Sequence, residues 1–264
     1  MVWQIKQLSK VKAKNPILIE GLPGMGNVGK IAIDFLIDTL KAKPVYELFS
    51  YDLPHCVFVN EQNVLELPAI KIYYKNLKKN TLFFLSGDIQ PISESSCYEF
   101  CNAVLDTVQK SDVNEIITLG GIALPKVPED PKVYCTGNSR KMVERYNFDP
   151  VDTNIHGMVG PIVGVSGLLP GLAGVRKIPA VALLAETFGH PNYLGVRGAR
   201  SLLKVLSKKL DLRLNLNELD AQIREIEQDA KKSLELQKVS ALLKKQKSES
   251  KFPSPTRDGT NYIG

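Results

Sequence analysis

From Ile17 to about Leu210, short apolar runs alternate with longer segments of helical periodicity. This alternation is typical of βα units, in which buried strands are joined by crossover helices. We expect strands at residues 17–20, 45–50, 56–60, 69–74, 81–85, 115–119, 133–136 and 180–184. We expect helices at residues 28–40, 93–109, 140–146, 160–172 and 193–210. The sequence therefore predicts a layered αβα domain of the α/β class over residues 1–215.

The pattern changes after Leu216. Apolar residues then recur four and three positions apart, as on one helix face, at Leu219, Ile223, Ile226 and Ala230. We expect a C-terminal helical extension over residues 216–247. From Ser248 the chain is rich in polar residues, glycine and proline, so residues 248–264 are predicted to form a flexible tail.

Composition places this chain of 264 residues among globular proteins, because 44% of its residues are hydrophobic and 23% are charged. The net charge is +6, but basic and acidic residues are interspersed, and the basic run at 238–251 lacks interleaved aromatic residues, so we expect no nucleic-acid partner. The uncharged stretch 153–175 contains six glycines and two prolines, which favours a buried segment over a membrane span. Four scattered cysteines and no secretory leader after Met1 favour a cytoplasmic protein with reduced thiols.

A glycine-rich segment lies between the first predicted strand and the first predicted helix. Gly24, Gly26 and Gly29 match the dinucleotide fingerprint G-x-G-x-x-G, in which a helix N-terminus receives a pyrophosphate. Gly24 to Lys30 also matches the phosphate loop G-x-x-x-x-G-K, although Ile31 stands where a hydroxyl would hold Mg²⁺. The other interpretation is a tight turn that packs the helix against the sheet. The residues favour the turn and leave a nucleotide site as the alternative.

Acidic residues follow three predicted strands, at Glu20, Asp88 and Glu186. The carboxyl ends of strands are where α/β enzymes place catalytic groups, so these are the best acid–base candidates, although carboxylates also cap loops and helices. Glu47 lies about as far beyond the glycine-rich segment as the acidic residue that binds ribose in dinucleotide sites, but it lies inside a predicted strand. The three histidines are far apart and lack partners at metal-ligand spacing, so we expect no metal site.

A second glycine pattern lies in the predicted helix at 160–172 and just beyond it. Its members are four and three residues apart, at Gly160, Gly164, Gly167, Gly171 and Gly174. A helix would gather them into one bare stripe, which allows another backbone to come close. We expect this stripe to pack against the protein's own sheet, with a subunit interface as the alternative. Pro161 suits a first helical turn, whereas Pro170 is expected to kink or interrupt the helix.

Five segments together resemble those of a known family. They are Ile17 to Gly29, Leu85 to Pro91, Ile117 to Gly121, Gly167 to Ala173 and Pro179 to Gly189. In order and spacing they resemble the PAC2 family, the archaeal relatives of proteasome assembly chaperone 2. The resemblance covers most of residues 15–235.

The resemblance implies an α/β fold similar to that of nucleoside phosphorylases, with a C-terminal helical extension. It also implies a homo-oligomer that binds proteasome α subunits or the α ring and has no established catalysis. On that basis no catalytic residue, cofactor or metal is expected. The glycine-rich segment is then expected to be architectural.

The end of the chain is the predicted partner-binding element. Some archaeal relatives end in a hydrophobic residue, a tyrosine and a final residue, and this tail enters pockets between α subunits. Here the chain ends Asn261-Tyr262-Ile263-Gly264, so the tyrosine is third from the end and follows a polar residue. An apolar pair at the tip of a segment with little else to bury is typical of a tethered anchor. Tyr262, Ile263 and Gly264 are therefore the candidate partner-binding residues.

Two hypotheses follow. The first is a non-enzymatic, proteasome assembly chaperone-like protein that oligomerises and binds proteasome α subunits. The second is a nucleotide- or nucleoside-binding enzyme, ligase-like or phosphorylase-like, that uses the loop from Gly24 to Lys30.

Overall fold

The computed structural model describes residues 3–155, 160–215, 217, 220–221 and 224. The chain divides into two units, Met1–Asp220 and Ala221–Gly264. Most of the predicted helical extension (216–247) and all of the predicted tail (248–264) lie outside the described residues.

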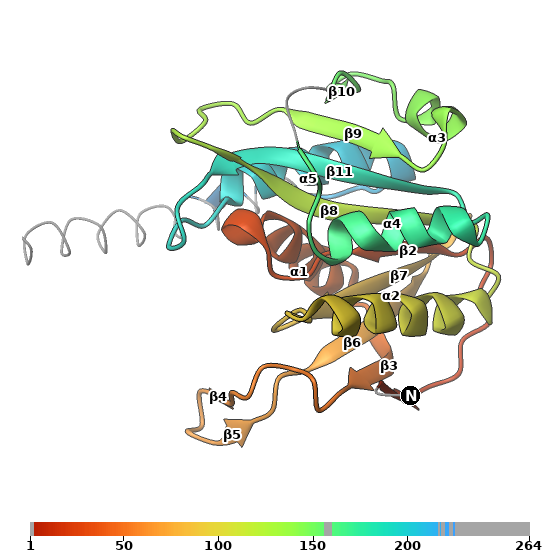
Figure 1. Ribbon diagram of the computed structural model, residues 1–264. Helices are drawn as coiled ribbons and strands as arrows, with labels where there is room; N and C mark the ends of the chain where they lie inside the picture. The colour runs from red at the N-terminus through yellow and green to blue at the C-terminus, as the bar shows by residue number, and fades with distance from the viewer. Residues whose placement is uncertain (1–2, 156–159, 216, 218–219, 222–223, 225–264) are drawn as a thin grey trace, which may run out of the picture. The chain divides into compact units, whose positions relative to one another are not determined.

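A nine-stranded sheet runs through the first unit, in the order β1-β3-β6-β7-β2-β8-β11-β9-β10 (Figure 1). Its strands are β1 (Gln4–Gln7), β2 (Ile17–Glu20), β3 (Lys43–Phe49), β6 (Ile70–Asn76), β7 (Thr81–Gly87), β8 (Glu115–Leu124), β9 (Val133–Gly137), β10 (Val151–Asp152) and β11 (Ala180–Phe188). The central strands β7, β2, β8 and β11 are parallel, whereas β1, β3 and β6 join them through antiparallel pairs. Strand β9 runs antiparallel to β11.

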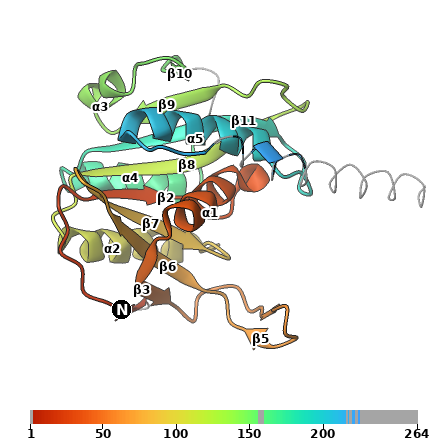
Figure 2. The same cartoon turned by 180° about the vertical axis from the view of Figure 1, so that it is seen from behind.

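Helices cover both faces of this sheet. They are α1 (Val28–Leu40), α2 (Glu94–Gln109), α3 (Arg140–Arg145), α4 (Val165–Val175) and α5 (Val196–Leu210), with a 3₁₀ turn, η1 (Met25–Asn27), before α1. Figures 1 and 2 show α2 and α4 on one face and α1 and α5 on the other. The predicted mixed α/β fold is therefore confirmed. No helix within the described part of the chain is long and apolar enough to cross a bilayer.

The central elements form where the sequence predicts them. Every residue of β2 and β7 is buried, as expected of parallel strands covered on both faces, which read as continuous apolar runs. Helix α2 begins after Ser93, whose hydroxyl accepts the Ser96 N–H at 3.2 Å and so satisfies one of the unpaired donors at the helix start.

The predicted strand at 56–60 is confirmed only for two of its residues, and it does not join the main sheet. These two residues form β4 (Phe58–Val59), which pairs with β5 (Leu65–Glu66) in a separate two-stranded hairpin. All four paired residues are exposed. An apolar run usually marks a buried strand, and here the apolar side chains instead lie on a projecting arm (Figure 1).

Helix α4 departs most from its prediction. It begins at Val165, because Gly164 has a φ of +87° that a non-glycine residue rarely adopts. Gly160 and Gly164 therefore precede the helix, and the predicted stripe of five glycines on one helix is wrong. The helix also continues through Pro170, so of the predicted kink or interruption, the interruption is wrong.

A hydrogen bond from the sheet explains why α4 tolerates Pro170. Proline has no N–H, so the carbonyl four residues earlier, that of Ser166, loses its helical partner. The Thr118 hydroxyl on β8 donates to this Ser166 carbonyl at 2.6 Å. The sheet thus replaces the bond that the helix cannot make.

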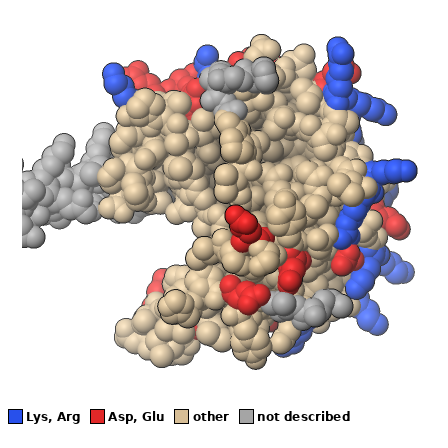
Figure 3. Space-filling view, in the orientation of Figure 1, with Lys and Arg blue, Asp and Glu red and all other residues tan. Residues whose placement is uncertain are grey.

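The helical glycines of α4 do not pack against the sheet as predicted. A Cβ atom at Gly167 would overlap the carbonyl of Ile162, in the segment that leads into the helix. A Cβ at Gly171 would meet nothing within 4 Å, and this residue is exposed. Helix α4 itself contains no charged residue. On the face shown in Figure 3, the Lys and Arg side chains lie mainly along the right-hand edge.

Candidate functional site

The strand order reverses at β2, in the centre of the sheet. Among the parallel strands, the chain passes from β2 to β7 on one side of β2 and then to β8 on its other side. In open α/β sheets, ligands bind in the crevice outside the carboxyl ends of the strands at such a point. A pocket of about 420 Å³ opens here, between the starts of α1 and α4.

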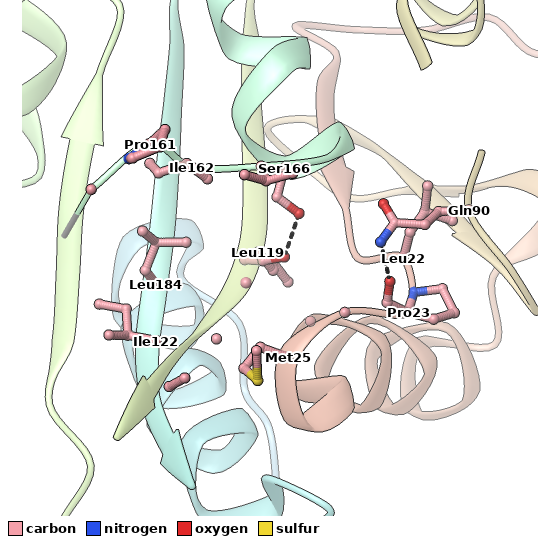
Figure 4. Close-up of a pocket in the computed structure, with 17 residues that line it drawn as sticks. Leu22, Pro23, Met25, Gln90, Leu119, Ile122, Pro161, Ile162, Ser166 and Leu184 are labelled. Carbon is pink, nitrogen blue, oxygen red and sulfur yellow. Dashed lines mark hydrogen bonds between the residues drawn. The ribbon is translucent and has the colours of Figure 1, made fainter. Parts of the chain in front are cut away.

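The pocket wall comes from five segments that are far apart in the sequence (Figure 4). Its lining residues are Leu22, Pro23, Gly24, Met25, Gly29, Gln90, Leu119, Gly120, Gly121, Ile122, Ala123, Gly160, Pro161, Ile162, Val163, Ser166 and Leu184. None of these lining residues is charged. Within the part of the chain that the structure describes, the pocket therefore offers hydrogen-bonding groups and apolar surface but no cation to balance a phosphate.

The glycines of the predicted nucleotide loop mostly serve packing. A Cβ at Gly29 would overlap the Leu119 carbonyl of β8, so α1 lies closer to the sheet than a residue with a side chain at this position would allow. Gly26 has a φ of +59°, and a Cβ there would lie 2.5 Å from Thr187 Oγ1. Gly24 is different, because a Cβ there would meet nothing closer than 4.0 Å. Two of the three fingerprint glycines are thus explained by the fold itself.

Lys30, the lysine of the phosphate-loop pattern, does not line this pocket. Its Nζ lies 2.5 Å from Asp34 Oδ2 and 3.3 Å from Ser86 Oγ. The Ser86 hydroxyl donates to the other Asp34 oxygen at 2.7 Å. Lys30 instead lines a second pocket, of about 530 Å³. Glu47, the candidate ribose acid, lies on β3 with its carboxylate 3.8 Å from the Lys71 ammonium, and it does not line the first pocket either.

Glu20 lies fully buried at the end of β2, in contact with a pocket residue. Its Oε1 accepts the Leu22 N–H at 2.9 Å, and its Oε2 lies 3.2 Å from Ser166 Oγ. Burial raises the pKa of Glu20 to about 8, against the lowering effect of these hydrogen bonds. The carboxyl is therefore mostly protonated at neutral pH.

A protonated Glu20 also completes a chain of hydrogen bonds. Ser166 Oγ lies 3.1 Å from the Leu119 carbonyl oxygen (Figure 4), and a hydroxyl has one proton to donate. When Glu20 donates to Ser166, Ser166 is free to donate to Leu119, and all the polar atoms are satisfied. The floor of the pocket is thus polar but neutral.

The three predicted acid–base candidates are not brought together. Asp88 accepts the Ala69 N–H at 2.9 Å and lines the second pocket. Glu186 accepts the Lys132 N–H at 3.0 Å and the Tyr134 hydroxyl at 3.1 Å, so it joins the segments around β9 and β11. Only Glu20 lies beside the first pocket. Within the described part of the chain no cluster of His, Cys, Asp and Glu could hold a metal ion.

Sequence reasoning missed Gln90 as a site residue. Its Nε2 donates to the Pro23 carbonyl at 2.8 Å, and its Oε1 lies 3.5 Å from the Val165 N–H at the start of α4 (Figure 4). This side chain therefore joins the glycine loop to the start of α4 at the wall of the pocket. Gln90 lies in Leu85 to Pro91, one of the five segments that carry the family resemblance, but nothing in that segment alone shows that its side chain reaches the glycine loop and α4.

The comparison with protein families decides the family. The sequence model described as the PAC2 family matches residues 18–234. The chain belongs to the PAC2 family. The resemblance seen in the five sequence segments is thereby confirmed.

Similar proteins agree with this assignment. The uncharacterized protein MJ1210 of Methanocaldococcus jannaschii is 28% identical over 270 residues, which cover 100% of both chains. The crystal structure of Pyrococcus furiosus PbaB, described as an archaeal proteasome activator, is 30% identical with a TM-score of 0.81, and covers 88% of this chain and 98% of that one. Pyrococcus furiosus PbaA, described as an archaeal homolog of proteasome-assembly chaperone, has the same fold at 23% identity, with a TM-score of 0.71 over 94% of this chain and 99% of that one.

The predicted partner-binding residues Tyr262, Ile263 and Gly264 lie outside the described residues. Their role remains a prediction.

Proposed function

We propose that this protein is a non-enzymatic, proteasome assembly chaperone-like protein that acts in the cytoplasm as a homo-oligomer and binds proteasome α subunits or the α ring. The observation that carries the proposal is the match to PbaB, an archaeal proteasome activator, over nearly the whole of that chain at 30% identity. The PAC2 match over residues 18–234 supports the same role.

We propose that the C-terminal residues make the contact. Tyr262 would fill an apolar pocket on the α ring, Ile263 would pack beside it, and the Gly264 carboxylate would pair with a lysine. Each tail has only a small area to bury and would bind weakly alone. Several tails on one oligomer would raise the overall affinity, because each further contact becomes intramolecular.

Native mass spectrometry of the full-length protein with purified α rings tests the proposal. We expect a complex with the full chain and its loss when Tyr262 to Gly264 are removed. The matched control deletes Ser254 to Thr256, which shortens the tail equally but keeps its last residues. The absence of a complex with the full chain would refute ring binding, whereas equal binding by both deletions would refute only the role of the tail.

The alternative is a nucleotide- or nucleoside-binding enzyme that uses the loop from Gly24 to Lys30, and its nucleotide form has less support. The described residues that line the pocket beside this loop are all uncharged, and Lys30 pairs with Asp34. A thermal-shift measurement with millimolar ATP and NAD distinguishes the two. If a nucleotide bound there, saturating ligand would stabilise the protein by a few kcal/mol and raise its melting temperature. We expect no such shift, because the described lining residues offer no charge to balance a phosphate.

A further inference from the structure

The proposed function makes no use of the uncharged pocket between α1 and α4. The pocket nevertheless has the position and size of a small-molecule site, since it lies at the carboxyl ends of β2 and β8 and measures about 420 Å³. Its lining combines apolar side chains, such as Met25, Ile122 and Leu184, with the polar groups of Gln90 and Ser166.

Main-chain groups of β8 supply further polar atoms. Strand β2 pairs with β8 only as far as Thr118, whereas β8 continues to Leu124. The N–H of Ile116 points toward β11, because it donates to the Pro179 carbonyl. Main-chain groups alternate in direction along a strand, so those of Gly121 and Ala123 point toward the place where β2 would continue. Among the described residues, these groups have no hydrogen-bond partner on that side.

The absence of charge among the described lining residues selects the kind of ligand. A phosphate or carboxylate moved into this pocket would lose its hydration without meeting a cation, which is costly. A neutral molecule loses less hydration free energy when it enters the pocket, and its donors and acceptors can form hydrogen bonds with the main chain of β8. The neutral Glu20 beneath Ser166 maintains this condition at neutral pH.

We propose that this pocket binds an uncharged small molecule, of about nucleoside size, that has an apolar ring and hydrogen-bonding groups. The ring would lie against the apolar wall, and its polar edge would bond to the free main-chain groups of Gly121 and Ala123. The proposal is independent of α-ring binding, because it concerns the first unit and not the tail.

Saturation-transfer NMR with the full-length protein tests it. The probes are adenosine, AMP and a panel of neutral heterocyclic fragments, each at millimolar concentration. AMP serves as the matched charged probe, since it adds one phosphate to the same ring system. Binding by the neutral probes should exceed that of their charged counterparts roughly tenfold or more, given the cost of an unpaired charge.

Two glycine variants locate the binding. Gly24→Phe should fill the pocket without strain, because Gly24 is extended and a Cβ there is unobstructed. Gly171→Phe is the matched control, because Gly171 is equally unobstructed but does not line the pocket. We expect neutral probes to bind the wild type and Gly171→Phe, and to lose binding in Gly24→Phe. The proposal fails if no neutral probe binds the wild type, if binding survives in Gly24→Phe, or if AMP binds as well as adenosine.

Discussion

Two hollows lie on either side of the glycine loop and α1, and they differ in charge. The described residues that line the first are Gly29 and sixteen others, all uncharged. The second is lined by Lys30, the next residue, together with Asp34, Asp38, Glu66, Lys71 and Asp88. Consecutive residues of a helix point about 100° apart, so Gly29 and Lys30 of α1 face different hollows. A lysine in a phosphate-loop pattern is therefore no evidence that the adjacent pocket is basic.

The largest expected effect concerns Glu20, whose protonation keeps the first hollow neutral. The pKa of Glu20 is about 8 in the folded state and near the ordinary 4.5 when the chain is unfolded. Between these two pH values the unfolded chain has released a proton that the folded protein retains. The free energy of unfolding should therefore fall by about 1.4 kcal/mol per pH unit as the pH rises, and level off above about pH 8.

The variant Glu20→Gln isolates this contribution, because its amide does not titrate. Urea denaturation of both proteins at several pH values measures the difference in slope. Parallel slopes for the two proteins would show that Glu20 is charged when folded, and that both hollows carry charge.

The next effect concerns the wall that separates the two hollows. Gly29→Ala places a methyl group onto the Leu119 carbonyl, where neither backbone can easily move. We expect the free energy of unfolding to fall by about 3 kcal/mol. The matched control is Gly24→Ala, in the loop that leads into α1, which should change the free energy of unfolding by less than about 0.5 kcal/mol. Equal stabilities in chemical denaturation would contradict the packing role of Gly29.

A moderate effect is expected at the α4 wall of the uncharged hollow. Thr118→Val removes the hydroxyl that satisfies the Ser166 carbonyl, and should cost about 1–2 kcal/mol of unfolding free energy. In a Pro170→Ala background the restored N–H can satisfy the same carbonyl, so Thr118→Val should cost less there. A double-mutant cycle by urea denaturation measures this coupling, and additive costs would rule it out.

The smallest effect is expected in the charged hollow. Lys30→Met breaks the pair with Asp34, whose side chain is 42% exposed. Pairs of this exposure contribute little, so we expect a loss of less than about 1 kcal/mol. ATP should leave the melting temperatures of both proteins unchanged. A thermal shift with ATP that disappears in Lys30→Met would instead identify Lys30 as a phosphate ligand.

Much of the central fold was predictable from the sequence. The bounds of β2 (Ile17–Glu20) and α1 (Val28–Leu40) match the predicted ranges, because an apolar run, a glycine turn and an amphipathic helix follow one another there. Strand β1 (Gln4–Gln7) was missed, because it lies exposed at the sheet edge and has no apolar pattern. It pairs antiparallel with β3, and Trp3 just before it packs on Phe100 at a ring distance of 4.7 Å.

The candidate site was only partly predictable. The glycine loop and Glu20 were identified from their places next to β2. The neutrality of the pocket was not, because it depends on which way Lys30 points and on segments around Gln90 and Gly160 that only the fold brings together. Spacing in the sequence locates a turn, but tertiary contacts decide what the turn faces.

The bond from Thr118 to α4 has a consequence for how this helix arises. A peptide of residues 160–176 contains Pro170 and several glycines and lacks the strand that supplies the missing donor. We expect such a peptide to show little helical circular dichroism in water. Helix α4 then depends on the sheet for its stability. During folding we expect it to form only after β8 has taken its place beside it.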